Sequence, residues 1–150
     1  IKPGLRKRFN DLIRGNFIST QTLIARKEIL YDVGLFDEKL PRLQDWALCL
    51  RLAKRHAIVY EAEPLVKVEI SDDSISRDIR KLVEATDMIL KKHAEDFRKR
   101  PEAAAMLCTN VCIEAFREGH LLAFARLFSR AVKTAGLRYP AALYSLWLRR

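Results

Sequence analysis

The spacing of hydrophobic residues along the chain changes near residue 75. Before this point, Ser19–Ile24 is rich in Thr and Ile and alternates between two faces, as a β-strand does. Ala57–Ile70 alternates in the same way, and its late apolar residues share one face. Pro64 cannot donate a hydrogen bond to a sheet, so it divides this second segment into two strands. The pattern predicts about three short strands in the first part of the chain.

Short helices are predicted between these strands. They cover Arg6–Arg14, Lys27–Val33 and Asp45–His56. Gly34 follows the second helix, where glycine readily takes the left-handed conformation that ends a helix, and Leu35 can then fold back onto the last turn.

After residue 75 the apolar spacing is helical throughout. It predicts a long helix from Ile79 to Phe97, a second from Pro101 to about Arg117, a third over Leu121–Ala135, and a last one opened by Pro140 and carrying Leu143, Leu146 and Trp147. The predicted fold class is therefore α+β and mostly helical. We expect a first domain over residues 1–74, followed by a helical, bundle-like extension over residues 75–150.

The net charge of +9, from 28 Lys and Arg against 19 Asp and Glu, favours anionic partners. No dense basic run is interleaved with aromatic residues, so nucleic acid is not among the partners we expect. No secretory signal or membrane-spanning run is visible in the sequence. The first residue is Ile1 rather than Met, and we expect the chain to be a piece of a longer protein.

Three cysteines are too few and too scattered for a disulfide framework, which favours a reducing compartment such as the cytoplasm. Cys108 and Cys112 lie four residues apart on one helix face, with His120 as the nearest further ligand. The pair can be read as part of a zinc site or as two small core residues, and the second interpretation is favoured because buried cysteine usually serves as a small hydrophobe.

Asp45 stands between a loop containing Pro41 and an apolar helix. Aspartate commonly caps the first turn of a helix by accepting backbone N–H groups. The same position also suits a catalytic carboxylate, since the start of a packed helix holds it at the rim of a site. The local residues alone favour the cap, and one residue can fill both roles.

Four motifs in order carry a family resemblance. They are a Thr-rich segment ending in a basic residue (STQTLIAR), a VG-x-FDE turn (VGLFDE), a helix start (QDWALCLRL), and a late strand (PLVKVEIS) leading into SIS. The stretch Gly15–Ser76 that contains them resembles the C-terminal half of a family 2 glycosyltransferase with the GT-A fold. The resemblance implies that the first domain is the C-terminal part of a GT-A α/β domain.

Such enzymes move a sugar from a nucleotide-sugar donor to an acceptor hydroxyl with inversion at the anomeric carbon. By this resemblance Asp45 is the general base that takes the proton of the hydroxyl. Gln44 and Trp46 flank it as substrate-binding residues, and Thr20 and Thr22 are expected to line the acceptor side of an open cleft beside Asp45. Ordinary strand packing is the alternative role for the two threonines.

The sequence departs from the family pattern in several places. Gln44 stands where Glu is common, and Glu69 and Ser71 replace an Arg and a metal-contacting His. Neither an Asp-x-Asp motif nor a Gly-rich phosphate loop occurs. We therefore expect the divalent metal of the full-length enzyme, Mg²⁺ or Mn²⁺, to be bound mostly by residues outside this chain, and we expect this fragment alone to be inactive.

The expected partners are a nucleotide-sugar donor, a hydroxyl acceptor on a glycan or lipid-linked sugar, and the missing N-terminal half of the enzyme, whose absence would favour self-association of the fragment. Trp147 and its neighbours fit either core packing or peripheral contact with a membrane, and the latter would place the protein at the inner face of the membrane. A second hypothesis for the whole chain is a non-enzymatic helical domain that binds other proteins.

Overall fold

The computed structural model describes residues 6–7, 9–61, 63–69 and 78–135. The chain divides into two compact units, residues 1–77 and 78–150, which we call the N-terminal unit and the helical unit and describe separately. The helix predicted after Pro140, with Trp147, lies outside the described residues, and so do Ile70 and Ser71.

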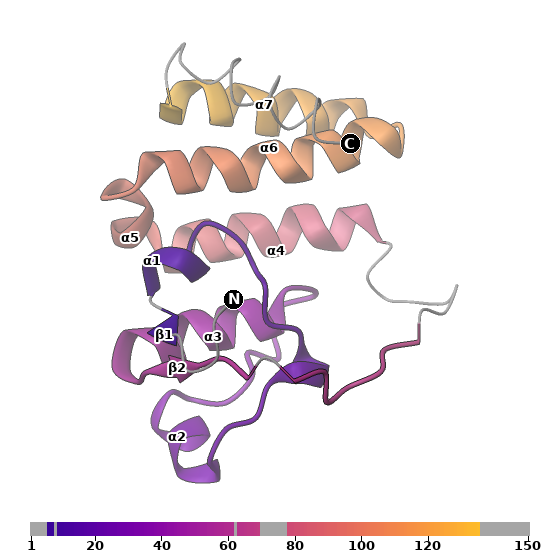
Figure 1. Cartoon of the computed structure of the whole chain (residues 1–150). Helices are drawn as coiled ribbons and strands as arrows, with labels where there is room; N and C mark the ends of the chain where they lie inside the picture. Colours follow the sequence, from indigo (N-terminus) through magenta and orange to yellow (C-terminus); the bar gives the residue numbers. More distant parts are fainter. Residues whose placement is uncertain (1–5, 8, 62, 70–77, 136–150) are drawn as a thin grey trace. The chain divides into compact units, whose positions relative to one another are not determined.

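The N-terminal unit contains short elements and one longer helix (Figure 1). In chain order these are β1 (Arg6–Lys7), α1 (Phe9–Leu12), the 3-10 turn η1 (Thr20–Thr22), α2 (Lys27–Asp32), α3 (Gln44–Arg55) and β2 (Ile58–Val59). β1 and β2 pair antiparallel, with Arg6 opposite Val59 and Lys7 opposite Ile58.

The predicted GT-A α/β domain with about three strands is wrong. Each described strand has only two residues. The first predicted strand, Ser19–Ile24, instead contains η1, because the Thr22 hydroxyl donates to the Ser19 carbonyl oxygen (3.1 Å) and offers the backbone a turn in place of a ladder. Within Ala57–Ile70 only Ile58–Val59 forms a strand among the described residues, although the side chains alternate.

The C-terminal end of α2 follows the prediction made from Gly34. Gly34 has φ +85°, its N–H donates to the Tyr31 carbonyl oxygen (3.1 Å), and the Leu35 N–H donates to that of Leu30 (2.9 Å). These two hydrogen bonds form a Schellman motif, which satisfies carbonyl groups that the helix end leaves free.

The core of the N-terminal unit gathers around α3. The side chains of Leu48, Cys49 and Leu50 are fully buried, and Trp46 is 2% exposed. Val33 packs with Leu48 and Leu52 in a hydrophobic cluster. Because this core holds α3, it also positions the residues of the first turn of α3, which include Asp45.

The helical unit consists of α4 (Ile79–Lys92), α5 (Ala94–Arg98), α6 (Pro101–Arg117) and α7 (Leu121–Ala135). Asp78 caps α4 by accepting the N–H groups of Arg80 (3.0 Å) and Lys81 (3.4 Å). The predicted helix from Ile79 to Phe97 is divided into α4 and α5 at His93.

Helices α6 and α7 form an antiparallel hairpin and pack along their length (Figure 1). Gly119, with φ +76°, makes the turn between them. Small side chains allow the helices to approach closely, and the buried residues of the pair include Ala105, Cys108, Cys112, Ala115 and Ala131.

Candidate functional site

The candidate catalytic residue Asp45 is the second residue of α3. The N-cap of this helix is Leu43, which adopts the left-handed conformation (φ 63°) and makes no side-chain capping bond. Asp45 lies two residues after the N-cap and is half-buried. Its Oδ1 accepts the backbone N–H of Trp46 at 2.7 Å. Asp45 therefore satisfies one free N–H of the first turn without being the N-cap residue.

Trp46 anchors this turn in the core. Its indole N–H donates to the Leu12 carbonyl oxygen at 2.7 Å, across α1 and α3. With 2% of its surface exposed, Trp46 has little area to offer a substrate. Its place in the structure is that of a positioning residue, because it holds the backbone N–H that binds the Asp45 carboxylate.

The other predicted substrate-binding residues lie in two places. Gln44 is half-buried, and its Nε2 donates to the Leu40 carbonyl oxygen at 2.9 Å. Thr20 and Thr22 are exposed on η1, where the Thr22 hydroxyl is also 3.2 Å from the Ser19 hydroxyl. No hydrogen bond described by the structure joins either threonine to Asp45.

Charge and burial make Cys49 an inert neighbour of this turn. Burial raises the pKa of its thiol to about 11, and the negative charge of Asp45 contributes in the same direction. At neutral pH Cys49 is therefore a thiol, which is a poor nucleophile and a poor metal ligand.

A cluster that the sequence analysis did not predict joins α2 to the end of α3. Asp32 binds Arg55 Nη1 (3.1 Å) and His56 Nε2 (3.0 Å) through its two oxygens. These hydrogen bonds from His56 and Arg55 lower the pKa of Asp32. Arg51 donates to the carbonyl oxygens of Val33 (2.9 Å) and Leu35, which gives this arginine a structural role at the end of α2.

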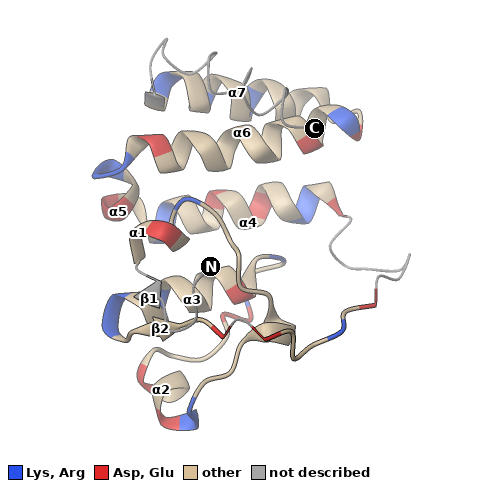
Figure 2. Ribbon diagram, viewed as in Figure 1, with Lys and Arg blue, Asp and Glu red and all other residues tan. Residues whose placement is uncertain are grey.

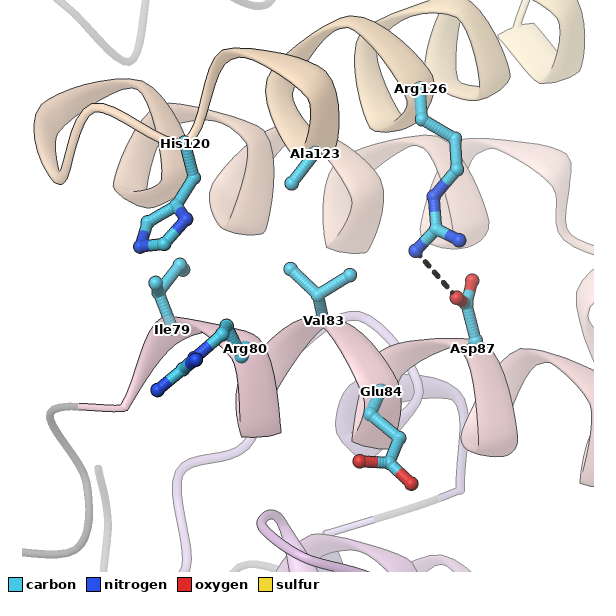
Figure 3. A pocket seen from close by; sticks show the side chains of 8 residues that line it. All are labelled: Ile79, Arg80, Val83, Glu84, Asp87, His120, Ala123 and Arg126. Atoms are coloured by element: carbon cyan, nitrogen blue, oxygen red, sulfur yellow. Dashed lines mark hydrogen bonds and ion pairs between the residues drawn. The ribbon is translucent and has the colours of Figure 1, made fainter.

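The helical unit contains a cavity of about 320 Å³ between α4 and the start of α7 (Figure 3). Asp87 at one end binds Arg126 Nη2 and Arg130 Nη1, each at 2.7 Å. The lining residues are Ile79, Arg80, Val83, Glu84, Asp87, His120, Ala123 and Arg126. All belong to the helical unit, so this cavity does not include Asp45, Thr20 or Thr22. In the sequence, the only signal of the two ion pairs with Asp87 was the spacing of Arg126 and Arg130 by one helical turn.

The two remaining cysteines are core residues of α6. Cys108 is 1% exposed and Cys112 is 2% exposed. Burial raises the pKa of Cys108, and it raises that of Cys112 to about 11 with a contribution from Cys108. In the part of the chain that the structure describes, no three His, Cys, Asp or Glu side chains are arranged to hold a metal ion. No described helix has the length and apolar character needed to cross a bilayer.

No family model, curated protein or solved structure matches this chain.

Proposed function

We propose that this chain contributes the acceptor side of an inverting glycosyltransferase, with Asp45 as the general base. The four ordered motifs in Gly15–Ser76 support the proposal. The observation that carries it is that only one oxygen of the Asp45 carboxylate is hydrogen-bonded within the described part of the chain. Oδ1 is held by the Trp46 N–H, and Oδ2 accepts no hydrogen bond from any residue that the structure describes. The proposal rests on this turn and does not require the α/β fold.

A carboxylate in this state fits the needs of the reaction. The acceptor hydroxyl attacks the anomeric carbon, the bond from that carbon to the donor's phosphate oxygen breaks, and the leaving nucleotide takes the electron pair. The proton of the hydroxyl passes to Asp45 Oδ2 as the new bond forms. A general base in hydrogen-bond reach of the proton typically contributes about 10²–10⁴ in rate.

The backbone around Asp45 explains why the carboxylate would stay in place. Trp46 holds the turn to Leu12 through its indole, and the Trp46 N–H fixes one carboxylate oxygen. Free N–H groups cluster at the start of a helix, so a negative side chain at the first turn of α3 interacts favourably with them. These contacts hold the Asp45 carboxylate by Oδ1 and leave Oδ2 for the proton of the acceptor.

The donor's phosphates and the Mg²⁺ or Mn²⁺ of the full-length enzyme need ligands beyond this turn. Among the described residues no three His, Cys, Asp or Glu side chains are placed to hold a metal ion, and the proposed role of this turn is that of the base alone. Nucleotide-sugar binding is assigned to the part of the enzyme that precedes the resemblance.

The test is the variant Asp45→Asn in the full-length gene product. Asparagine can still accept the Trp46 N–H through its amide oxygen but cannot take a proton from the acceptor. We expect kcat to fall by at least about 10², with little change in donor affinity or in the circular dichroism spectrum.

The matched control is Glu38→Gln, which removes one exposed negative charge from the neighbouring VGLFDE motif. It should retain activity. Asparagine stabilises the start of a helix nearly as well as aspartate does. Near-normal turnover by Asp45→Asn would therefore refute the role of Asp45 as general base.

A further inference from the structure

The last described helix, α7, begins a segment with one sign of charge. From Leu121 to Arg150 the sequence contains six Lys or Arg residues and neither Asp nor Glu. Figure 2 shows no acidic residue on α7, whereas red marks acidic residues elsewhere in the helical unit. The segment therefore carries much of the chain's excess of +9 in its last fifth.

The same helix exposes large apolar side chains. Leu122 is 90% exposed, Leu121 62% and Phe128 39%. At the end of α6, Phe116 is 58% exposed and contacts the Phe124 ring, with 5.3 Å between centroids. We define the outer apolar face as Phe116 together with Leu121, Leu122, Ala125, Phe128 and Val132 of α7. An exposed Leu is common by itself, but several at helical spacing form an amphipathic surface.

The inner side of α7 faces the rest of the helical unit. Leu127 and Ala131 are buried in the core of the unit. Arg126 and Arg130 bind Asp87 of α4. Lys133 is exposed. The helix thus has an inner apolar stripe, a basic flank and the outer apolar face. On the outer face Phe116 and Phe128 pack against the Phe124 ring, while Leu121 and Leu122 remain 62% and 90% exposed.

We propose that α7 lies in the plane of an anionic lipid bilayer, with the outer apolar face in the boundary between headgroups and acyl chains. Basic amphipathic helices with Leu and Phe on one face bind membranes in this way, and the face enters roughly 5–10 Å. Anionic headgroups complement the basic segment. A second copy of α7 complements it poorly, because α7 has no Asp or Glu that could pair with Lys133 of the other copy. This inference is independent of the proposed catalytic role of Asp45.

The test is co-sedimentation of the 150-residue chain with lipid vesicles. Vesicles of phosphatidylcholine with about one third phosphatidylserine should bind the protein, and vesicles of phosphatidylcholine alone should bind it much more weakly. Lys133→Gln should weaken binding to anionic vesicles by roughly fivefold, since one basic residue near such a surface contributes that much.

The matched pair of variants is Leu122→Gln and Ile24→Gln. Leu122 is 90% exposed on α7, and Ile24 is 89% exposed in the N-terminal unit, so both substitutions spare the core. Leu122→Gln should weaken vesicle binding by about tenfold, because it removes a side chain that enters the apolar boundary. Ile24→Gln should bind as the unmodified chain does.

Three results would overturn the proposal. The first is equal binding to neutral and anionic vesicles, and the second is unchanged binding by Leu122→Gln. The third is a dimer in sedimentation velocity that Leu122→Gln dissociates, which would assign the outer apolar face to a second copy of the chain. Circular dichroism of each variant shows that loss of binding does not come from loss of fold.

Discussion

Replacing Trp46 with phenylalanine should destabilise the N-terminal unit by about 2–3 kcal/mol. The substitution removes the hydrogen bond from the indole to the Leu12 carbonyl oxygen. That carbonyl also accepts the Gly15 N–H at 3.1 Å, so it keeps a partner, and the loss is close to the net value of one hydrogen bond, about 1 kcal/mol. The void left by the smaller ring in a site that is 2% exposed adds roughly 1–2 kcal/mol.

The measurement is hydrogen exchange followed by mass spectrometry, which resolves the two units. Peptides from α3 should exchange faster in Trp46→Phe, and peptides from α6 should keep their protection, because Trp46 and Leu12 both belong to the N-terminal unit. Phe36→Leu is the control, since Phe36 is 43% exposed in the same unit and should change stability by less than about 0.5 kcal/mol. A loss below about 0.5 kcal/mol in Trp46→Phe would refute the anchoring role.

Two further predictions concern ionisable groups. Because His56 and Arg55 lower the pKa of Asp32 below its usual 3.8, the unmodified chain should have a higher urea midpoint than Asp32→Asn at pH 6, and the difference should disappear as pH falls below 3.8. A difference that persists to roughly pH 2 would contradict the ion-pair cluster. Because burial raises the pKa of Cys49 and Cys112 to about 11, both thiols should resist alkylation at pH 8 in the native chain and react in urea. Rapid native labelling, assigned with single Cys→Ala variants, would show that these thiols are accessible.

The sequence was a good guide where structure depends on near neighbours. Helical periodicity located α6 and α7 and placed the end of α6 at Arg117 and the start of α7 at Leu121. Gly34 was predicted to be left-handed because few other residues adopt that conformation easily, and it has φ +85°. These features are determined within one or two turns of the chain.

The sequence was a poor guide where structure depends on distant partners. β2 lies inside the predicted strand segment Ala57–Ile70, but β1 lies where a helix was predicted over Arg6–Arg14, and that prediction is wrong at Arg6–Lys7. β1 is a strand because it pairs with β2, about fifty residues further along the chain. Thr and Ile favoured a strand over Ser19–Ile24, but the hydroxyl groups of Ser19 and Thr22 formed a turn instead.

In the candidate site, too, the features set by neighbouring residues were predicted and those set by distant residues were not. The start of α3 was predicted within one residue, because Asp45 and the apolar spacing after it are local signals. Leu43 as the left-handed N-cap was not predictable, since leucine has no preference for that conformation. The pairing of Asp87 with Arg126 and Arg130 depends on how α4 and α7 come together in space, which neither helix encodes alone.

The pairing of β1 with β2 also bears on how the N-terminal unit can be joined to other protein. Arg6 lies opposite Val59, so the backbone enters and leaves the paired core at points about 5 Å apart. The two ends of the segment 6–59 therefore lie side by side, as the ends of a domain that can be inserted into a longer chain do. Sequence on either side of this segment can be lengthened or replaced without separating the two paired strands. Residues 6–59 are therefore a suitable segment for inserting the Asp45 turn into another protein.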